Sequence, residues 1–396
     1  MTRPSTHEAV NAQGHDRGAD SARSAVYIVI PGDLETRTGG YGYDRRIMAG
    51  LRTLGWAVHL VALDEGFPLP APAARERAAR ALAAIPAGAL VLIDGLALGA
   101  LPEEIEREAG RLRIVALVHH PLAAETGIDP ALAAALESSE RRALAATQAV
   151  IVTSRATAAA LASYGVTAER VTVVEPGTDP APLARRSALG SKLSTVSEEP
   201  SPLRPQPSEV ALLCVATLTP RKGYELLIKA LAAIPQRNWR LTCAGSVDRD
   251  AATAARVRAL IRDGGLDDRV ALVGDMDAAA VAQEYDRADV FVLPTLYEGY
   301  GMAVAEALAR GLPVVSTATG AIEDLVRDAG IIVPPGDLAA FTAAVSSVIG
   351  DPELRARLGE RARVARERLP TWDAAAAAMA DALHRENRRA EALRDV

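Results

Sequence analysis

Two glutamates lie eight positions apart in the segment LYEGYGMAVAEALARGLPVV, which spans residues 296–315. Glu298 is followed by Gly299 and Gly301, whereas Glu306 lies in an alanine-rich run. Paired carboxylates can act as acid and base in glycoside hydrolysis, which requires them to lie about 5–9.5 Å apart. Eight residues of continuous helix would rise about 12 Å. The glycines indicate that the segment is not helical throughout, so hydrolysis stays open but is a poor fit.

The glycines favour a different chemistry, in which a helix begins close to Gly301. The preceding run DVFVLPT is typical of a strand, whose carboxyl end would lead through a short loop into the helix. A helix N-terminus attracts anions, and glycine lets a phosphate approach the backbone. Glu298 would then precede the helix, and Glu306 would lie about a turn and a half inside it. A nucleoside-diphosphate sugar could contact both carboxylates with its hydroxyls, although two solvated surface glutamates are the simpler alternative.

A basic pair occurs at a comparable place in the segment TLTPRKGYELL, residues 217–227. Arg221 and Lys222 follow the strand-like run EVALLCVAT, so they would lie at the carboxyl end of a strand. Charge-assisted contacts from such a pair could neutralise a diphosphate leaving group without a metal. An ordinary basic pair with no binding role is the alternative, but the position after a strand favours a binding site, with both side chains exposed at the strand end.

Strand-like and helix-like runs alternate along most of the chain, which predicts an α/β fold with two Rossmann-like domains and parallel sheets. The alternation stops in a serine- and proline-rich segment and then restarts, which is typical of a linker between two domains. A ligand would be expected in the cleft between them. The predicted parts are a disordered tail at 1–23, a first domain at 24–186, a linker at 187–208, a second domain at 209–370 and a C-terminal helix at 371–396.

Together, the glutamate pair, the strand before it, the trailing ARGLPVV and the RKG turn resemble the family-4 retaining glycosyltransferases of the GT-B fold. The resemblance is strong over residues 210–370 and weak over the first domain. It implies that the two domains face each other across a cleft and that the C-terminal helix could pack back onto the first domain. It also implies that Glu306 holds the ribose hydroxyls and Glu298 a hydroxyl of the donor sugar. Arg221 and Lys222 would then hold the diphosphate.

The resemblance extends to backbone contacts around the helix start and in the first domain. The backbone near Met302 and Ala303 would meet the phosphate or the sugar. In the first domain, RTGGYGYDRRI (37–47) matches a glycine-rich loop that closes over the diphosphate, which makes Gly39 and Gly40 donor-binding candidates.

Two adjacent histidines follow a strand-like run in VALVHHPLAAETG, where members of the family often carry one histidine that contacts the donor. We favour His119 for this role and keep His120 as a second candidate. A hydrogen-bonded structural imidazole is the alternative for either residue.

The resemblance further implies the reaction. A hexosyl group would pass from a nucleoside-diphosphate sugar to an acceptor with retention, assisted by the departing phosphate oxygen. No metal or cofactor would be needed, and the acceptor could be a glycan, a lipid or a small molecule. Arg221 and Lys222 would stabilise the charge that develops on the leaving group, and Glu298 would orient the sugar.

Three other functions remain open from the residues. Asp64 lies about twenty residues beyond GGYG, as in nicotinamide-dependent oxidoreductases, but GGYGYD does not complete the G-x-G-x-x-G pattern. Asp248 and Asp250 follow a strand-like run and could bind a metal. A scaffold that binds nucleotide sugars without turnover would be expected to lack some of the residues that act on the donor, and all of them are present.

Composition narrows the class of protein. The 396 residues are 49% hydrophobic and 24% charged, which is typical of a globular chain with two domains. The formal net charge of −6 argues against a general nucleic-acid binder but allows local basic sites. Cys214 and Cys243 lie in apolar strand-like runs and are expected to be buried thiols.

Membrane and export signals are weak. The first twenty residues have no apolar signal-peptide region, and residues 84–101, the least charged stretch, contain a proline, an aspartate and three glycines. We therefore expect a cytoplasmic protein. Arg141, Arg142, Arg185 and Arg186 could contact a membrane surface peripherally, but a solvated face is the simpler interpretation.

Overall fold

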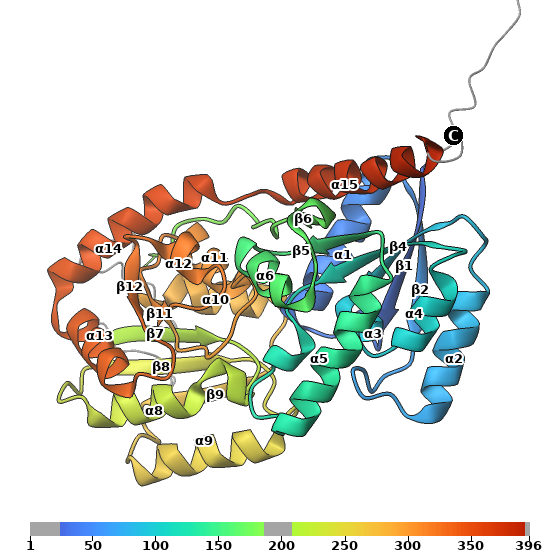
Figure 1. Ribbon diagram of the computed structural model, residues 1–396. Helices are drawn as coiled ribbons and strands as arrows, with labels where there is room; N and C mark the ends of the chain where they lie inside the picture. The colour runs from blue at the N-terminus through green and yellow to red at the C-terminus, as the bar shows by residue number, and fades with distance from the viewer. Residues whose placement is uncertain (1–23, 186–207, 393–396) are drawn as a thin grey trace, which may run out of the picture.

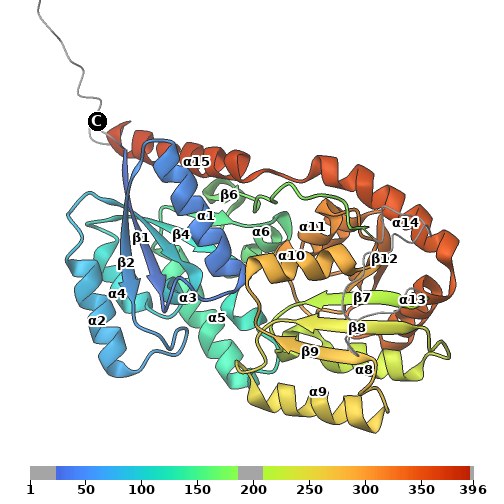
Figure 2. The same cartoon turned by 180° about the vertical axis from the view of Figure 1, so that it is seen from behind.

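The computed structural model of the protein describes residues 24–185 and 208–392, which form two α/β domains (Figures 1 and 2). The strands of the first domain are β1 (Ala25–Pro31), β2 (Ala57–Leu63), β3 (Leu90–Asp94), β4 (Arg113–Val118), β5 (Ala149–Val152) and β6 (Val171–Val173). They form one sheet in the order β2-β1-β3-β4-β5-β6, with parallel pairing between neighbours. The predicted Rossmann-like alternation is confirmed in this half of the chain.

Different helices cover the two faces of the first sheet. The helices are α1 (Gly39–Thr53), α2 (Pro72–Ala83), α3 (Gly95–Leu98), α4 (Pro102–Glu108), α5 (Pro130–Ala145), α6 (Arg155–Ala160) and, from the end of the chain, α15 (Trp372–Ala392). Successive strand residues point to opposite faces. Ile28 of β1 therefore packs with α1 and α15, whereas Val29 packs in the core formed with α2 to α5. The sequence did not predict the short helices α3 and α4 between β3 and β4.

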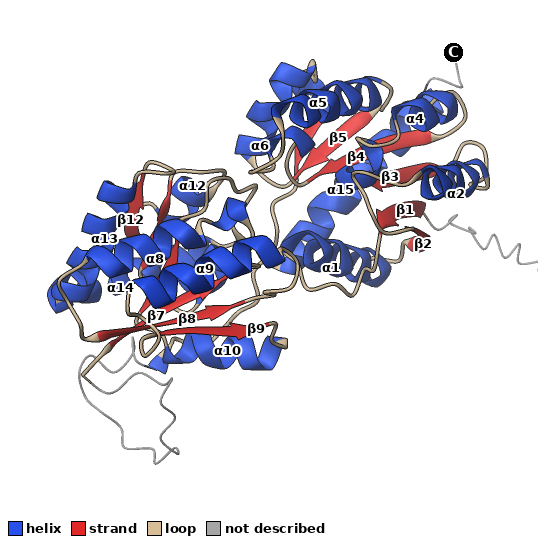
Figure 3. Ribbon diagram, turned by 90° about the horizontal axis from the view of Figure 1, so that it is seen from below, coloured by secondary structure: helices blue, strands red, loops and turns tan. Residues whose placement is uncertain are grey.

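The second domain repeats this architecture. Its strands are β7 (Val210–Val215), β8 (Trp239–Ala244), β9 (Val270–Gly274), β10 (Val290–Leu293), β11 (Val314–Thr317) and β12 (Gly330–Val333). They form a parallel sheet in the order β12-β11-β10-β7-β8-β9. Figure 3 shows each sheet, in red, lying among its helices. The predicted fold class, two Rossmann-like domains with parallel sheets, is confirmed.

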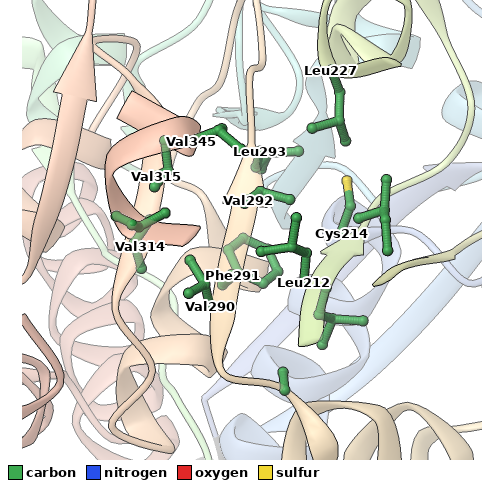
Figure 4. Packing of buried hydrophobic residues seen from close by; sticks show 14 of the residues in the cluster. Leu212, Cys214, Leu227, Val290, Phe291, Val292, Leu293, Val314, Val315 and Val345 are labelled. Carbon is green, nitrogen blue, oxygen red and sulfur yellow. The ribbon is translucent and has the colours of Figure 1, made fainter. Parts of the chain in front are cut away.

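One large apolar core spans the second domain, beside a small cluster around Tyr300. Its helices are α8 (Tyr224–Ala233), α9 (Ala251–Asp263), α10 (Ala278–Arg287), α11 (Met302–Ala309), α12 (Ile322–Val326), α13 (Leu338–Gly350) and α14 (Pro352–Ala365). Figure 4 shows β10 at the centre of this core, with Phe291 lying between the side chains of β7 and β11. Cys214 and Cys243 are paired in register on the neighbouring strands β7 and β8, and both are buried free thiols, as expected. Burial raises the pKa of Cys214 to about 12.

The C-terminal helix α15 lies against the first domain (Figure 1). A Cβ placed on Gly50 of α1 would lie only 2.4 Å from the Cβ of Ala376, so the two helices touch at their backbones. Polar contacts fix the far end of the helix, where Nη1 of Arg113 donates to Oδ1 of Asn387 at 2.6 Å. Helix α15 thus contributes to the apolar core on the α1 face of the first sheet.

Candidate functional site

The candidate site lies where the loop after β10 meets the carboxyl end of β4 in the other domain. A Cβ placed on Gly299 would lie 2.3 Å from the carbonyl oxygen of His119, so only glycine fits there without a shift of the backbone. The hydroxyls of Thr153 and Thr157 donate to that same carbonyl, each at 3.3 Å. The domains therefore touch at residues that the sequence places at strand ends.

Helix α11 begins directly after Gly301, as the sequence predicts, and presents its N-terminus at this contact. Gly301 is the N-cap residue and has a φ of 99°, in the left-handed region that glycine tolerates. Glycine brings no side-chain acceptor for the first N–H groups of the helix, which begins with Met302 and Ala303. An anionic group could occupy this position favourably.

A short 3-10 turn, η4 (Pro220–Lys222), brings two cations to the same loop. Nζ of Lys222 donates to Oε2 of Glu298 at 2.5 Å, and Oε1 of Glu298 lies 3.8 Å from Nη1 of Arg221. Nη1 of Arg221 also donates to the carbonyl of Tyr297 at 3.0 Å. The structure thus brings together three of the predicted site residues from two loops that are far apart in sequence.

The basic pair is less exposed than an ordinary surface pair, and the expectation of an exposed pair is wrong. The side chains of Arg221 and Lys222 are 17% and 15% exposed. Glu298 covers Lys222, and Glu125 from the first domain lies 3.3 Å from Nε of Arg221. Glu298 from the second domain and Glu125 from the first domain therefore shield the basic pair from solvent.

The charges in this cluster control its ionisation. Burial opposes the ionisation of Glu298, but the charges of Lys222 and Arg221 outweigh it and hold the pKa of Glu298 below its usual range. Burial lowers the pKa of Lys222, and the charge of Glu298 does not fully offset this effect. A carboxylate held ionised between two cations accepts hydrogen bonds and is unsuited to act as a general acid. Glu298 therefore does not suit the role of the general acid that glycoside hydrolysis would require of the glutamate pair.

Glu306 lies in the second turn of α11, close to the side chains of Tyr285 and Arg310. Burial raises the pKa of Glu306, and the Tyr285 hydroxyl and the charge of Arg310 oppose this rise. The Tyr285 hydroxyl donates to the carbonyl of Ala303 at 3.0 Å, and the Arg310 guanidinium lies 4.5 Å from the centre of the Tyr285 ring. Glu306 is therefore a partly buried carboxyl that could bind the hydroxyls of a ligand.

Gly39 and Gly40 were expected in a loop before the first helix, but they form the first turn of that helix. Helix α1 begins at Gly39, with Thr38 as its N-cap residue. A Cβ on Gly39 would lie 3.7 Å from Sδ of Met302, and a Cβ on Gly40 would lie 3.6 Å from Cδ2 of His119. The first turn of α1 thus lies beside both the start of α11 and the favoured histidine.

The two histidines have different surroundings. Nε2 of His119 lies 3.3 Å from Oδ1 of Asp44 and 3.4 Å from Oδ2 of Asp94. Nε2 of His120 lies 3.7 Å from Oε2 of Glu125, the carboxylate that also approaches Arg221. Both imidazoles thus lie near the contact between the domains, His119 in a buried acidic cluster and His120 beside the basic pair.

Sequence reasoning missed three acidic residues at this site. Asp94 ends the apolar run of β3, so the strand-end argument used for His119 would have identified it. Asp44 in the first helix and Glu125 in a loop carry no local signal. Their importance depends on tertiary contacts with His119 and Arg221.

The structure gives Asp250 and Asp64 structural roles. Asp250 is the N-cap of α9, accepting from the N–H of Thr253 at 2.8 Å and from its hydroxyl at 2.9 Å. Asp64 accepts from Nε of Arg77 at 2.5 Å. Among the described residues, the group of potential metal ligands that lie together is Asp44, Asp94 and His119, whose ligand atoms fall within 4.8 Å of one another.

The arginines considered for membrane contact form ion pairs. Arg141 pairs with Glu137, Arg142 with two glutamates of α4, and Arg185 with Asp286. Arg186 lies outside the described residues. Within the part of the chain that the structure describes, no helix combines the length and the apolar character needed to cross a bilayer.

Comparisons with known proteins match both domains. The family model described as "Glycosyl transferases group 1" matches residues 197–365, and that described as "Glycosyltransferase Family 4" matches residues 92–182. The D-inositol 3-phosphate glycosyltransferase of Xylanimonas cellulosilytica is 32% identical over 63% of this chain and 60% of that protein. The amylovoran biosynthesis glycosyltransferase AmsK of Erwinia amylovora is 32% identical over 46% and 43% of the two chains. The matched part thus spans about three fifths or less of these curated relatives.

Solved structures share the fold. A sucrose-phosphate synthase from Thermosynechococcus elongatus has a TM-score of 0.75 with 23% identity, over 93% of this chain and 100% of that one. The Anabaena protein HepE, solved in complex with UDP and glucose, has a TM-score of 0.68 with 17% identity, over 91% and 99% of the two chains. At these identities the likeness establishes a common architecture for the two domains.

Proposed function

The chain belongs to the family-4 glycosyltransferases of the GT-B fold, and from this premise we propose that it transfers a hexosyl group from a nucleoside-diphosphate sugar to an acceptor. The observation that carries the proposal is the meeting of Lys222, Arg221 and Glu298 beside the N-terminus of α11. Two cations and a helix start suit a diphosphate, and a neighbouring ionised carboxylate suits a sugar hydroxyl.

The donor would lie along the first turns of α11. Its diphosphate would contact the N–H groups at Met302 and Ala303, with Arg221 and Lys222 on its other side. Glu306 would accept hydrogen bonds from the ribose hydroxyls. It lies about 7.5 Å along the helix from Gly301, at roughly 1.5 Å per residue. The backbone of Gly39 and Gly40 would close the site from the first domain.

The transfer would proceed with retention and without a metal or cofactor. The bond between the anomeric carbon and the phosphate oxygen breaks, the acceptor oxygen bonds to that carbon on the same face, and the acceptor proton passes to the departing phosphate. Arg221 and Lys222 stabilise the negative charge on the leaving diphosphate. This stabilisation is the protein's largest contribution to lowering the barrier. Glu298 orients the sugar, and His119 donates a hydrogen bond to the donor, with His120 as the second candidate.

Relatives support a nucleotide-sugar donor. The Anabaena HepE structures were solved in complex with UDP and with UDP-glucose, and several curated relatives are D-inositol 3-phosphate glycosyltransferases. The acceptor of this chain is a glycan, a lipid or a small molecule. The paired arginines of the first domain give no support to a membrane-bound acceptor in particular.

Calorimetric titration with UDP, GDP and ADP, followed by assays of nucleoside-diphosphate release from the matching sugar nucleotides, tests the proposal. We expect tight binding of one diphosphate and release that persists in EDTA, with an unchanged anomeric configuration in the product. Binding of intact donors without any release would favour a binding scaffold. Oxidation of NADH with no nucleoside-diphosphate binding would favour an oxidoreductase, and release abolished by EDTA would restore a metal.

A further inference from the structure

Three ionisable side chains of the first domain meet close to its contact with the second domain. Asp44 comes from α1, Asp94 ends β3 and His119 follows β4. The imidazole nitrogen Nε2 lies within 3.4 Å of both carboxylates. The aspartate side chains are 2% and 3% exposed, whereas that of His119 is 20% exposed. The cluster is closed on the aspartate side and accessible on the imidazole side.

The two carboxylates have little other compensation within the described residues. Oδ1 of Asp94 accepts from the N–H of Leu96 at 2.8 Å, whereas neither oxygen of Asp44 has a hydrogen-bond partner. Nε2 of His119 likewise makes no aligned hydrogen bond and faces both carboxylates at ion-pair distance. Arg45 follows Asp44 in the sequence, but its guanidinium donates to two backbone carbonyls of the loop before α1. The ring of Tyr43 packs edge-on against the imidazole at 5.3 Å and brings no charge. Carboxylates removed from water need a compensating cation, and the imidazole is the group placed to supply it.

The surroundings of this histidine favour its protonated form. Burial favours the neutral ring, but the two aspartates outweigh burial and raise the pKa of His119 to about 10. Burial raises the pKa of Asp44, and the charge of His119 opposes that rise. An imidazolium carries a proton on each ring nitrogen, so Nδ1 has an N–H while Nε2 faces the carboxylates.

We propose that Asp44 and Asp94 are positioning residues that hold His119 as an imidazolium and leave its Nδ1–H to donate to a ligand bound between the domains. The ligand group must accept a hydrogen bond, as a hydroxyl or phosphate oxygen does, because an imidazolium has no acceptor. The inference rests on the proposed function in naming that ligand as the sugar donor. Gly40 packs beside the ring, since a Cβ there would lie 3.6 Å from Cδ2, and the two threonine hydroxyls on the His119 carbonyl fix the backbone that carries the side chain.

Histidine NMR tests the ionisation without any substrate. The chain has six histidines, and a His119→Gln variant identifies the signal of interest. In the wild type we expect the His119 signal to stay that of an imidazolium between about pH 6 and 8. In Asp44→Asn and in Asp94→Asn the pKa should fall by about one unit or more, because each change removes a neighbouring charge. A wild-type His119 that titrates near pH 6.5, its ordinary value, would overturn the proposal, as would unchanged titration in both variants.

Donor kinetics separate positioning from a general loss of stability. We expect the wild-type KM for the donor to stay constant between about pH 6 and 8, and that of Asp44→Asn to rise as its histidine loses the proton. Glu104→Gln is the matched control, because it removes another buried carboxylate of this domain, one paired with Arg75. The control should lose stability and keep the wild-type pH profile. A control that reproduces the Asp44→Asn profile would overturn the positioning role, and absence of any transfer would contradict the proposed function while the NMR result still stands.

A divalent cation is the competing occupant of this cluster, because the three ligand atoms lie close enough to share one. The wild type and Asp44→Asn can be dialysed against zinc or magnesium and analysed for bound metal. We expect no difference in metal content between them. One equivalent bound by the wild type and lost in the variant would overturn the proposal, since Nε2 cannot carry a proton and a metal together.

Discussion

Nζ of Lys222 lies 2.5 Å from Oε2 of Glu298, so the cation assigned to the leaving group and the carboxylate assigned to the sugar are partners of each other. The pair is 15% and 13% exposed, and Arg221 lies on its other side. A diphosphate that binds here would share Lys222 with Glu298. Changing either side chain therefore alters both the binding site and the stability of the loop that carries it.

Replacing both Arg221 and Lys222 with alanine should weaken nucleoside-diphosphate binding by well over tenfold. Each charge-assisted contact to phosphate contributes about 1.5–3 kcal/mol. The double variant should also lose stability, by about 3 kcal/mol or more, because Glu298 is left partly buried without a cation. Adding Glu298→Gln should recover much of that stability but not the binding, as measured by thermal unfolding and calorimetry. Unchanged nucleotide affinity in the double variant would place the diphosphate elsewhere.

Glu306→Gln should impair nucleotide binding, whereas Glu298→Gln should impair turnover. If Glu306 holds the ribose, its variant should bind both the free nucleoside diphosphate and the intact donor more weakly. Glu298→Gln should keep nucleoside-diphosphate affinity and lose turnover, since a misoriented sugar loses contacts in the transition state. Titration calorimetry and pH–rate profiles separate these patterns from an acid–base pair, in which both variants would bind nucleotide normally and lose a pH-dependent rate term. Normal nucleotide binding by Glu306→Gln would remove its ribose assignment.

Local sequence patterns were sufficient to predict the strands and the helix start of the site. DVFVLPT became β10, and α11 begins after Gly301, because a buried parallel strand and a glycine before a helix each have a signature within a few residues. The carboxyl ends of parallel strands share one edge of a sheet, which places the RKG turn and Glu298 at the same edge, and the pairing of β7 with β10 makes them neighbours. The short helices α3, α4 and α12 lacked enough turns to show a helical period.

Contacts between the domains and between helix and strand could not be predicted in this way. Glu125 approaches Arg221 across the domain boundary, and its sequence surroundings show no sign of a site. In the sequence Asp44 looks like an ordinary helical residue, and only the packing of α1 in the folded domain brings it to His119. The burial of the basic pair depends on both kinds of contact, which is why the expected exposure was wrong.

Glu140→Gln should stabilise the protein above about pH 5, and more at pH 8. Glu140 is fully buried in α5, where its Oε2 accepts from the N–H of Leu122 at 2.9 Å and its Oε1 has no partner. Burial raises the pKa of Glu140 to about 8, against the opposing effect of the Leu122 N–H. The folded state then binds more protons than the unfolded state between about pH 4.5 and 8, so stability falls as pH rises through that window.

Thermal unfolding of wild type and Glu140→Gln at pH 5 and pH 8 checks this prediction. Glu104→Gln provides the contrast, because its buried carboxylate is paired with Arg75 and its loss should lower the melting temperature. If Glu140→Gln changed the melting temperature equally at both pH values, the raised pKa would be contradicted.

Gly50→Ala should destabilise the protein although alanine is the better helix former. Gly50 lies within α1, where replacing glycine by alanine ordinarily gains about 0.8–1 kcal/mol. Its added Cβ would lie 2.4 Å from the Cβ of Ala376 in α15, and overpacking of this kind costs about 1–3 kcal/mol. Gly42→Ala is the matched control on the same helix, because a Cβ there meets nothing within 4 Å and should stabilise. Chemical denaturation of both variants gives the two signs, and a stabilising Gly50→Ala would show that α15 does not pack against α1 in solution.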